Sequence, residues 1–227
     1  ADGRIICSSP NFPQWRDVPF GTLLAERADC PVHVENDASA AAWGAYLQRG
    51  SGEDLVLLTL GTGVGGGVVS GGQLLRGASG CAAEIGHMYV GGDRLCGCGA
   101  RGCLETWIST GGLIAGAAAH GRTVPDGRAV LDGASAGEDW ARAVCAEAGE
   151  ALGRGLRNVV NLLNPDVVIM AGGLSAGREH FEPTLGAALA AGTVGPALAR
   201  VKLVWLGRAE SLAIVGVADQ GARSQML

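Results

Sequence analysis

The sequence predicts an α/β protein. Short apolar runs that resemble strands alternate along the chain with helix-like segments, and several of these runs end in glycine. A long amphipathic helix is predicted over Glu138–Leu163. Hydrophobic residues make up 48% and charged residues 17% of the 227 residues. A chain of this length and composition can bury a sizeable core, which excludes a disordered protein.

The amino-terminal part is predicted to hold two strands and two helices. Asp37 is predicted to cap the second helix, because a side-chain oxygen at this position accepts hydrogen bonds from free amides of the first turn. Gly50 is predicted to end that helix. The predicted elements are the strands Arg4–Cys7 and Val32–Glu35 and the helices Phe20–Ala28 and Ala38–Gln48.

A glycine-rich segment interrupts the middle of the chain. The buried strand Asp54–Leu60 runs into GTGVGGG, and Gly67–Ser70 is predicted to be its hairpin partner. Met88–Val90 is predicted as a further short strand.

The carboxy-terminal part alternates helices with strands. The apolar stripe of Glu138–Leu163 repeats at helical spacing, and Asn164-Pro165 ends it. The elements predicted after it are the strand Asp166–Ala171, the helix His180–Ala191, the strand Val201–Leu206 and the helix Leu212–Arg223.

Charge and hydropathy exclude several classes of protein. The net charge is −5 and no basic patch stands out, so we expect no direct binding to nucleic acid. No uninterrupted apolar stretch is long enough for a membrane span, and the first residues do not resemble a signal peptide. Three of the seven cysteines are crowded together, which favours a metal site in a reducing cytoplasm over disulfides.

Cys96, Cys98 and Cys103 form the predicted metal site. Three thiolates and one imidazole are typical of a closed tetrahedral zinc site. On spacing alone, either His87 or His120 could supply the imidazole, and the alternative is a group of buried free thiols beside an unrelated histidine. His33 and His180 are interpreted as ordinary core or surface residues.

The segment Leu60–Gly67 is predicted to bind phosphate. Its glycines allow backbone amides to face an anion, and Thr62 adds a hydroxyl. It is neither a P-loop nor a dinucleotide fingerprint, because it lacks G-K-[ST] and is followed by a strand. The alternative is a plain glycine-rich hairpin.

Two groups of polar residues are candidates for substrate contacts. Asn36-Asp37 would place a general base at the rim of a cleft, but taken alone the pair is better explained as a plain helix cap. Glu84, His87 and Glu105 could bind the hydroxyls of a sugar. Glu105 could instead be the favourable negative charge of a helix start.

Together these motifs resemble the ROK family, which groups bacterial sugar kinases with sugar-responsive repressors. The resemblance rests on DASAAA after Asn36, LGTGVGGG, AAEIGH and CGCGARGCLE, of which the last is highly specific. Pro10-Asn11 with Trp15 and the run Asp166–Gly173 also fit. The resemblance covers nearly the whole chain. It implies a two-domain, actin/hexokinase-like (ribonuclease H-like) α/β fold that transfers the γ-phosphate of ATP to a sugar hydroxyl.

The resemblance assigns roles to single residues. Asp37 matches the general base that takes the proton from the sugar hydroxyl. His87 matches a residue with one ring nitrogen on zinc and the other facing the sugar, which settles His87 over His120. The other matches are Ser9, Asn36, Glu84 and Glu105 at sugar-binding positions, Thr62 and Gly63 in the second phosphate loop, and Gly172 and Gly173 in the adenosine loop. With four protein ligands, zinc would be structural and would hold the sugar-binding rim.

The chain departs from the family pattern at its start. Family kinases open with a D-x-G-G-T-like first phosphate loop whose acid helps to hold Mg²⁺, and this chain has no such motif. We therefore expect that the amino-terminal part of the small domain is missing and that activity is impaired. The expected division is a small-domain remnant over 1–41, a large domain with the zinc loop over 42–213, and a helix returning to the small domain over 214–227.

The function expected from the resemblance is that of a glucokinase-like sugar kinase. The alternatives are the sugar-sensing domain of a ROK-type repressor and an inactive sugar-binding remnant. The identity of the hexose or N-acetylhexosamine stays open, as does the choice between ATP and polyphosphate as donor. The expected setting is a cytoplasmic homo-oligomer with no membrane contact.

Overall fold

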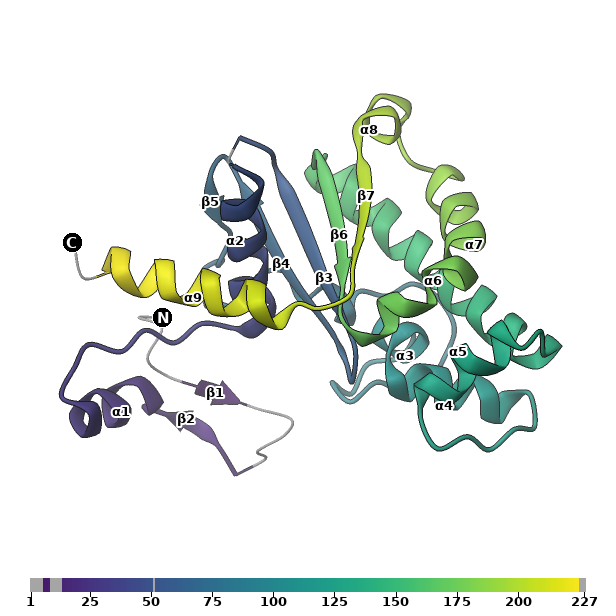
Figure 1. The fold of residues 1–227 in the computed structure, drawn as a ribbon, viewed down its shortest axis with the longest axis horizontal. Helices are drawn as coiled ribbons and strands as arrows, with labels where there is room; N and C mark the ends of the chain where they lie inside the picture. The colour runs from purple at the N-terminus through teal and green to yellow at the C-terminus, as the bar shows by residue number, and fades with distance from the viewer. Residues whose placement is uncertain (1–5, 9–13, 51, 225–227) are drawn as a thin grey trace.

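A five-stranded mixed sheet forms the centre of the protein, with helices on both of its faces (Figure 1). The computed structural model describes residues 6–8, 14–50 and 52–224. The strand order is β5-β4-β3-β6-β7. The strands are β3 (Leu55–Leu60), β4 (Val64–Ser70), β5 (Gln73–Leu74), β6 (Val167–Ala171) and β7 (Lys202–Leu206). The predicted α/β class is confirmed.

The central strands are continuous apolar runs because both of their faces are covered. β3 lies parallel to β6, with Leu55 opposite Val167, and antiparallel to β4. β6 lies parallel to β7. Every residue of β6 is buried. The carboxyl ends of β3, β6 and β7 therefore lie at the same edge of the sheet.

Most helices pack on one face of the sheet, where they enclose the larger core. The stripe predicted for the long helix is confirmed: its residues Leu152, Leu156 and Val160 are fully buried there. Glycines of this helix let the next long helix approach closely, since a Cβ at Gly149 or Gly153 would lie 2.4 Å from a backbone oxygen of that helix. The helices after β5 are α3 (Glu105–Ile108), α4 (Thr110–Ala119), α5 (Gly127–Ser135), α6 (Asp139–Leu163), α7 (Arg178–Ala190) and α8 (Gly195–Arg200).

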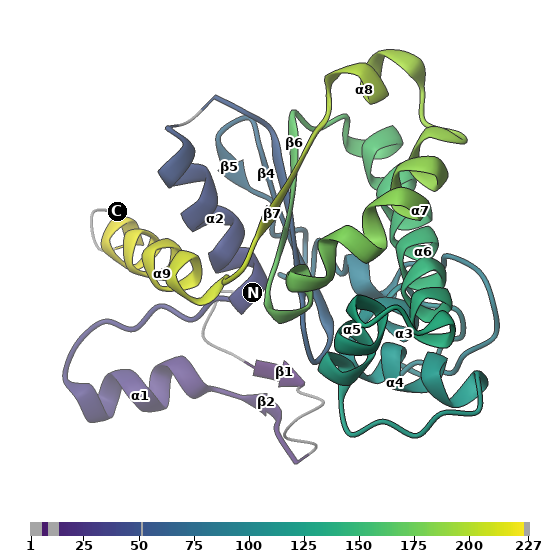
Figure 2. The same cartoon turned by 45° about the vertical axis from the view of Figure 1, so that its right-hand side comes forward.

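Two helices cover the opposite face, and they cross each other at glycines. α2 (Asp37–Arg49) and α9 (Glu210–Ser224) pack against β3 and β6 in a second core. A Cβ at Gly44 would lie 1.9 Å from the carbonyl oxygen of Leu212, and one at Gly216 would lie 1.9 Å from that of Ala40. Figures 1 and 2 show α9 passing across α2.

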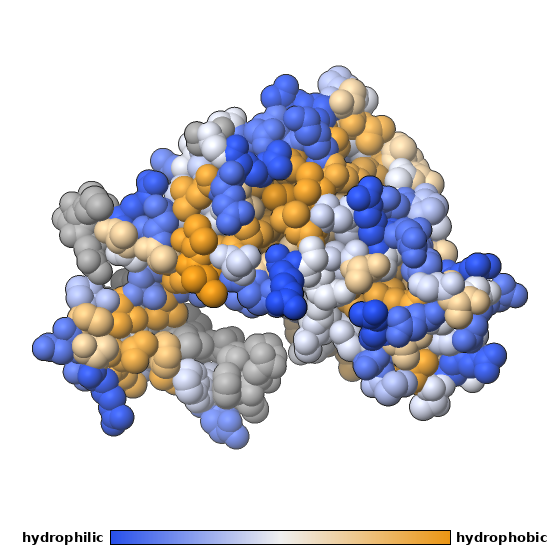
Figure 3. Space-filling model, in the orientation of Figure 1, coloured by the Kyte–Doolittle hydropathy of each residue, from blue (hydrophilic) through white to orange (hydrophobic). Residues whose placement is uncertain are grey.

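The amino-terminal elements lie apart from the central sheet (Figure 1). β1 (Ile6–Ser8) pairs antiparallel with β2 (Arg16–Val18), and α1 (Phe20–Ala28) follows. Apolar side chains of α1 are exposed, including Leu23 and Leu24. Figure 3 shows this apolar surface together with a second one over the central part of the molecule. Among the described residues, no helix combines the length and the apolar character needed to cross a membrane.

Three local predictions were wrong. Val32–Glu35 is not a strand: it pairs with no strand in the part of the chain that the structure describes, and its polar side chains bond to a loop and to α9 instead. Met88–Val90 forms only one bridge pair, between Tyr89 and Cys103. Asn36, and not Asp37, is the N-cap of α2: its Oδ1 accepts a hydrogen bond from the Ser39 amide at 3.0 Å, and Asp37 is the first helical residue.

The glycine crossing makes a prediction about stability. Gly216→Ala forces a methyl group against the Ala40 carbonyl oxygen, so we expect it to lower the free energy of unfolding by about 3 kcal/mol. Gly186→Ala in α7 is the matched control, because no atom lies within 4 Å of its added Cβ. This control should stabilise the protein by about 0.5–1 kcal/mol. Urea unfolding of both variants measures the difference, and equal effects would contradict the packing described.

Candidate functional site

The start of β4 is the point where the separate parts of the candidate site meet. A Cβ at Gly65 would lie 2.9 Å from the Ala38 Cβ, and one at Gly67 would lie 2.6 Å from the Ala38 carbonyl oxygen. A Cβ at Gly66 would lie 2.2 Å from the Ala83 carbonyl oxygen. Side chains alternate between the faces of a strand. The three glycines therefore admit the start of α2 on one face and the turn before Glu84 on the other.

Asp37 stands at the exposed start of α2. Its Oδ1 accepts a hydrogen bond from the Ala38 amide at 2.8 Å. Ala38 and the next residues are buried against β4, which fixes the first turn of the helix. Asn36 is exposed as well, with its side chain engaged in the cap. The helix dipole favours a negative charge at this end, and the Asp37 carboxylate is accessible there to a ligand.

Glu105 connects the glycine-rich loop to the cysteine cluster. Its Oε2 accepts a hydrogen bond from the Val64 amide at 2.9 Å, and its Oε1 lies 3.8 Å from Cys96 Sγ. A Cβ at Gly63 would lie only 2.5 Å from Glu105 Oε2. Glu105 is half-buried at the start of α3. The Glu105 carboxylate thus fixes the start of β4, and part of the carboxylate is exposed beside the glycine-rich loop.

The loop 61–63 joins β3 to β4 and rests on the start of α4. The Gly61 carbonyl oxygen accepts hydrogen bonds from the amide of Thr110 at 2.8 Å and from its Oγ1 at 3.2 Å. Thr62 is exposed at the tip. β4 begins at Val64, three residues earlier than predicted, so the loop between the two strands has only these three residues.

A second glycine turn lies beside the first. Gly172 follows β6 with a φ of +114°, a region that favours glycine, and a Cβ there would lie 2.5 Å from the Leu60 carbonyl oxygen. Ser175 Oγ donates to the Gly172 carbonyl oxygen at 2.7 Å. Gly173 is exposed and begins the 3₁₀ helix η2 (Gly173–Gly177). Because β3 and β6 are parallel neighbours, the two predicted nucleotide loops lie side by side.

The structure brings His87 and the three predicted cysteines together. One ligand atom from each of the four residues lies within 4.8 Å of all the others. His87 Nδ1 lies 3.5 Å from Cys96 Sγ, and Cys98 Sγ lies 3.8 Å from Cys103 Sγ. Ligands of a tetrahedral zinc ion are separated by roughly 3.5–3.8 Å, given Zn–S and Zn–N bonds of about 2.3 and 2.0 Å. The donor set and its spacing fit a zinc ion.

His120 does not belong to this cluster. Its Nε2 lies 3.1 Å from Glu147 Oε1 on α6. Of the remaining cysteines of known burial, Cys30 and Cys81 are exposed, and Cys145 is buried elsewhere in the core. The choice of His87 over His120, left open by spacing, is therefore settled by the fold.

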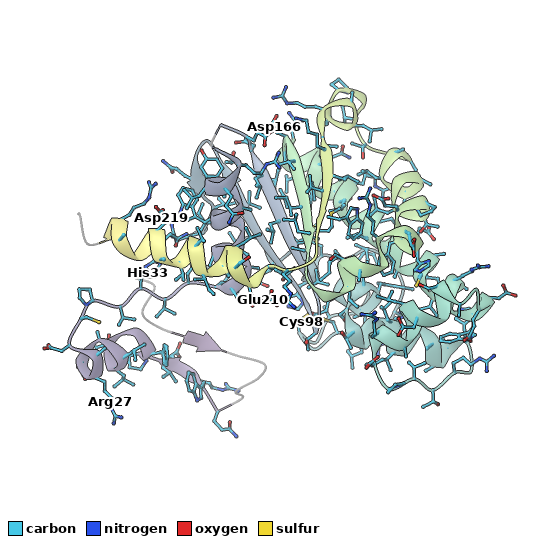
Figure 4. All side chains as sticks on the ribbon, viewed as in Figure 1. Arg27, His33, Cys98, Asp166, Glu210 and Asp219 are labelled. Carbon is cyan, nitrogen blue, oxygen red and sulfur yellow. The ribbon has the colours of Figure 1, made fainter. Side chains whose placement is uncertain are left out.

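Short backbone bridges shape the loop that carries the cysteines. Leu95 pairs with Arg101, and the Cys96 amide donates to the Ala100 carbonyl oxygen at 2.8 Å. The pKa of the Cys103 thiol is raised to about 12, mainly because the thiol is buried. The Ala100 backbone amide is the main cause that lowers the pKa of the exposed Cys98. A metal ion must displace these protons when it binds. Figure 4 shows Cys98 near the end of the sheet.

Two features that shape the site were not predicted from the sequence. Ser109 caps α4 and Thr110 holds the loop at Gly61, although Ser-Thr-Gly-Gly before an alanine-rich run is a readable helix start. Ala83, at a φ of +66°, turns the chain into Glu84 and η1 (Ile85–His87), and nothing in the sequence indicates it. Ser9, the predicted sugar contact, lies outside the described residues. Glu84 and His87 are exposed.

Comparison with known proteins identifies the family. The profile of the ROK family matches residues 1–210. The chain belongs to the ROK family. It is 37% identical over 200 residues to a glucokinase of Thermotoga maritima, covering 80% of this chain and 63% of that enzyme. It is 30% identical over 192 residues to a xylose repressor of Caldicellulosiruptor bescii, covering 78% of this chain and 48% of the repressor.

A solved structure of the family agrees with this fold. The ROK glucokinase of Streptomyces griseus, solved with glucose and AMPPNP, superposes with a TM-score of 0.82 at 30% identity. The match covers 98% of this chain and 78% of that enzyme. Such similarity confirms the predicted actin/hexokinase-like fold class. The chain spans 63% of the length of the Thermotoga glucokinase and 59% of that of a Halalkalibacterium halodurans glucokinase.

The bridging role of Glu105 makes a prediction about stability. Glu105→Ala leaves the Val64 amide without its acceptor, so we expect a loss of about 1–3 kcal/mol in the free energy of unfolding. Glu105→Gln keeps a side-chain oxygen and should lose less than about 1 kcal/mol. Glu179→Ala removes a carboxylate that is 75% exposed and should change stability by under about 0.5 kcal/mol. Denaturant unfolding measures the free energy of unfolding of the three variants. Equal values for all three would contradict a stabilising contact between Glu105 and the Val64 amide.

Proposed function

We propose that the protein is a sugar kinase that transfers the γ-phosphate of ATP to a hydroxyl of a hexose or N-acetylhexosamine, with glucose as the first substrate to test. One observation carries the proposal: the two exposed glycine turns, at 61–63 and 172–173, follow the carboxyl ends of parallel neighbouring strands. Ligands of open α/β sheets bind at this edge. The similarity to glucokinases supports the same assignment.

In this proposal Asp37 is the general base. The sugar hydroxyl attacks the γ-phosphorus of ATP, its proton passes to a carboxylate oxygen of Asp37, and ADP leaves with the electrons of the broken P–O bond. Such transfers depend on position and charge more than on covalent help from the protein. A positioned base contributes roughly 10²–10⁴-fold to the rate. Asp37 suits the role because it is exposed on a helix turn that β4 holds rigidly.

The remaining residues would orient the two substrates. Asn36, Glu84, His87 and Glu105 would contact sugar hydroxyls, together with Ser9. Thr62 and Gly63 would offer a hydroxyl and an amide to the phosphates of ATP, and Gly172 and Gly173 would face the adenosine. Mg²⁺ bound to the nucleotide would neutralise part of the phosphate charge.

We propose further that the cysteine cluster holds a structural zinc ion. Its four protein ligands leave no open position, so the ion would not take part in the chemistry. Its place beside Glu105 favours a supporting role. Cys96 is both a ligand and the neighbour of Glu105 Oε1, so the ion would help to fix the carboxylate that holds the Val64 amide.

The sugar-sensing part of a repressor is the second candidate. The similarity to the xylose repressor favours it, because sugar binding without phosphoryl transfer would use the same proposed sugar contacts. The two candidates differ in what happens to ATP, so a turnover assay separates them.

Turnover with Mg-ATP tests the kinase proposal. The chain is assayed with glucose and a panel of other hexoses and N-acetylhexosamines. We expect sugar phosphate to form and Asp37→Asn to lower kcat by about 10²–10⁴-fold with sugar binding retained. Asp29→Asn is the matched control, since Asp29 ends α1 and its left-handed φ of +49° suits asparagine too. Sugar binding without any turnover would leave the sensor and a kinase that needs a first phosphate loop as the two alternatives. Unchanged turnover in Asp37→Asn would remove Asp37 as the base.

Metal analysis tests the zinc proposal. Purified protein should carry about one zinc ion per chain, and Cys98→Ser should lose most of it because a closed site depends on all four ligands. Cys81→Ser removes an exposed cysteine outside the cluster and should keep its zinc. Elemental analysis and thermal unfolding follow both variants, and full occupancy in Cys98→Ser would refute the ligand assignment.

A further inference from the structure

A cluster of four polar side chains joins three segments that are far apart in the sequence. His33 and Glu35 come from the stretch between α1 and α2, Arg76 follows β5, and Gln220 lies on α9. Figure 4 labels His33 next to α9. His33 Nε2 lies 3.0 Å from Gln220 Oε1 and 3.9 Å from Glu35 Oε2. None of these residues belongs to the glycine turns or to the cysteine cluster.

Glu35 is the centre of the cluster. Its side chain is only 10% exposed, and its Oε2 accepts hydrogen bonds from Arg76 Nε at 3.0 Å and from Nη2 at 2.8 Å. Its Oε1 accepts one from the Asn36 amide at 3.1 Å. One carboxylate therefore fixes both the guanidinium and the backbone of the residue that caps α2. Asp37 is the next residue along the chain.

Arg76 reaches the other half of the site through its backbone. Its carbonyl oxygen accepts a hydrogen bond from the Ala82 amide at 3.1 Å, which closes the turn that leads to Glu84. Its Nη2 also donates to Gln220 Oε1 at 2.7 Å, which ties the turn to α9. A charge-assisted pair with one partner shielded from water holds its geometry better than an exposed ion pair.

We propose that Glu35 and Arg76 are positioning residues, a clamp that holds Asn36-Asp37 in register with the turn carrying Glu84 and His87. The assignment of Asp37 and Glu84 to the sugar site rests on the proposed function. The coupling of the two segments rests on the contacts alone. Small displacements of a reacting group can cost up to about 10²-fold in rate, so a clamp of this kind has a kinetic effect.

Hydrogen exchange tests the clamp without any assay of activity. In Arg76→Gln we expect amides of 36–40 to exchange about tenfold faster, although Glu35, the residue before this segment, lies 41 positions from the substitution. Exchange in β3 and β6 should not change. Glu35→Gln should accelerate amides of 76–84 in the same way. Arg76→Lys keeps the charge and should restore part of the protection. If each substitution accelerates exchange only in its own segment, the proposal is overturned. Because the two variants probe the pair from opposite ends, this outcome can be recognised even if one of them folds poorly.

Kinetics test what the clamp does for the site. Arg76→Gln should lower kcat and raise the sugar KM, so that kcat/KM falls by about tenfold or more, and Arg76→Lys should recover part of it. Arg128→Gln is the matched control, because it breaks an exposed pair with Asp132 on α5. Wild-type kcat and KM in Arg76→Gln would overturn the proposal while leaving the kinase intact. Coupled exchange without turnover in the parent chain would support the clamp independently of the kinase proposal.

Discussion

The close approach of two segments to the glycines of β4 is the constraint on which the site depends. Gly65 and Gly67 leave room for the first turn of α2, and Gly66 leaves room for the turn before Glu84 on the opposite face. Any side chain at these positions would push one segment away, because the nearest atoms lie under 3 Å from an added Cβ. The run of glycines is therefore a packing requirement, in addition to lying next to the proposed phosphate loop.

Polar contacts then join the parts that the glycines bring together. Glu105 connects the Val64 amide to the cysteine cluster, and the Glu35–Arg76 pair connects the start of α2 to the turn before Glu84. Each carboxylate accepts a hydrogen bond from a backbone amide, and such charge-assisted bonds hold position well. The site is thus positioned by residues on both sides of the sheet, while the crossing of α2 and α9 at Gly44 and Gly216 supports it from behind.

Several features followed directly from local sequence. The cysteine spacing, the stripe of α6 and the glycine breaks after β3 and β6 depend on neighbouring residues, so they could be read before the fold was known. The strand prediction for Val32–Glu35 was wrong because apolar and polar residues alternate there as in a strand. Its polar side chains instead bond to distant residues, Glu35 to Arg76 across 41 positions and His33 to Gln220 across 187.

The α/β class, the three clustered thiols and the resemblance to the ROK family can all be inferred from the sequence alone, because each depends on residue types and short spacings. The tertiary structure was needed to show that Asn36 caps α2 and that the two glycine turns are neighbours. It also places His87 rather than His120 beside the cysteines, which spacing had left open and the resemblance had implied. Those outcomes depend on the parallel pairing of β3 with β6 and on packing against β4. Long-range pairing and packing bring together residues that no local pattern relates.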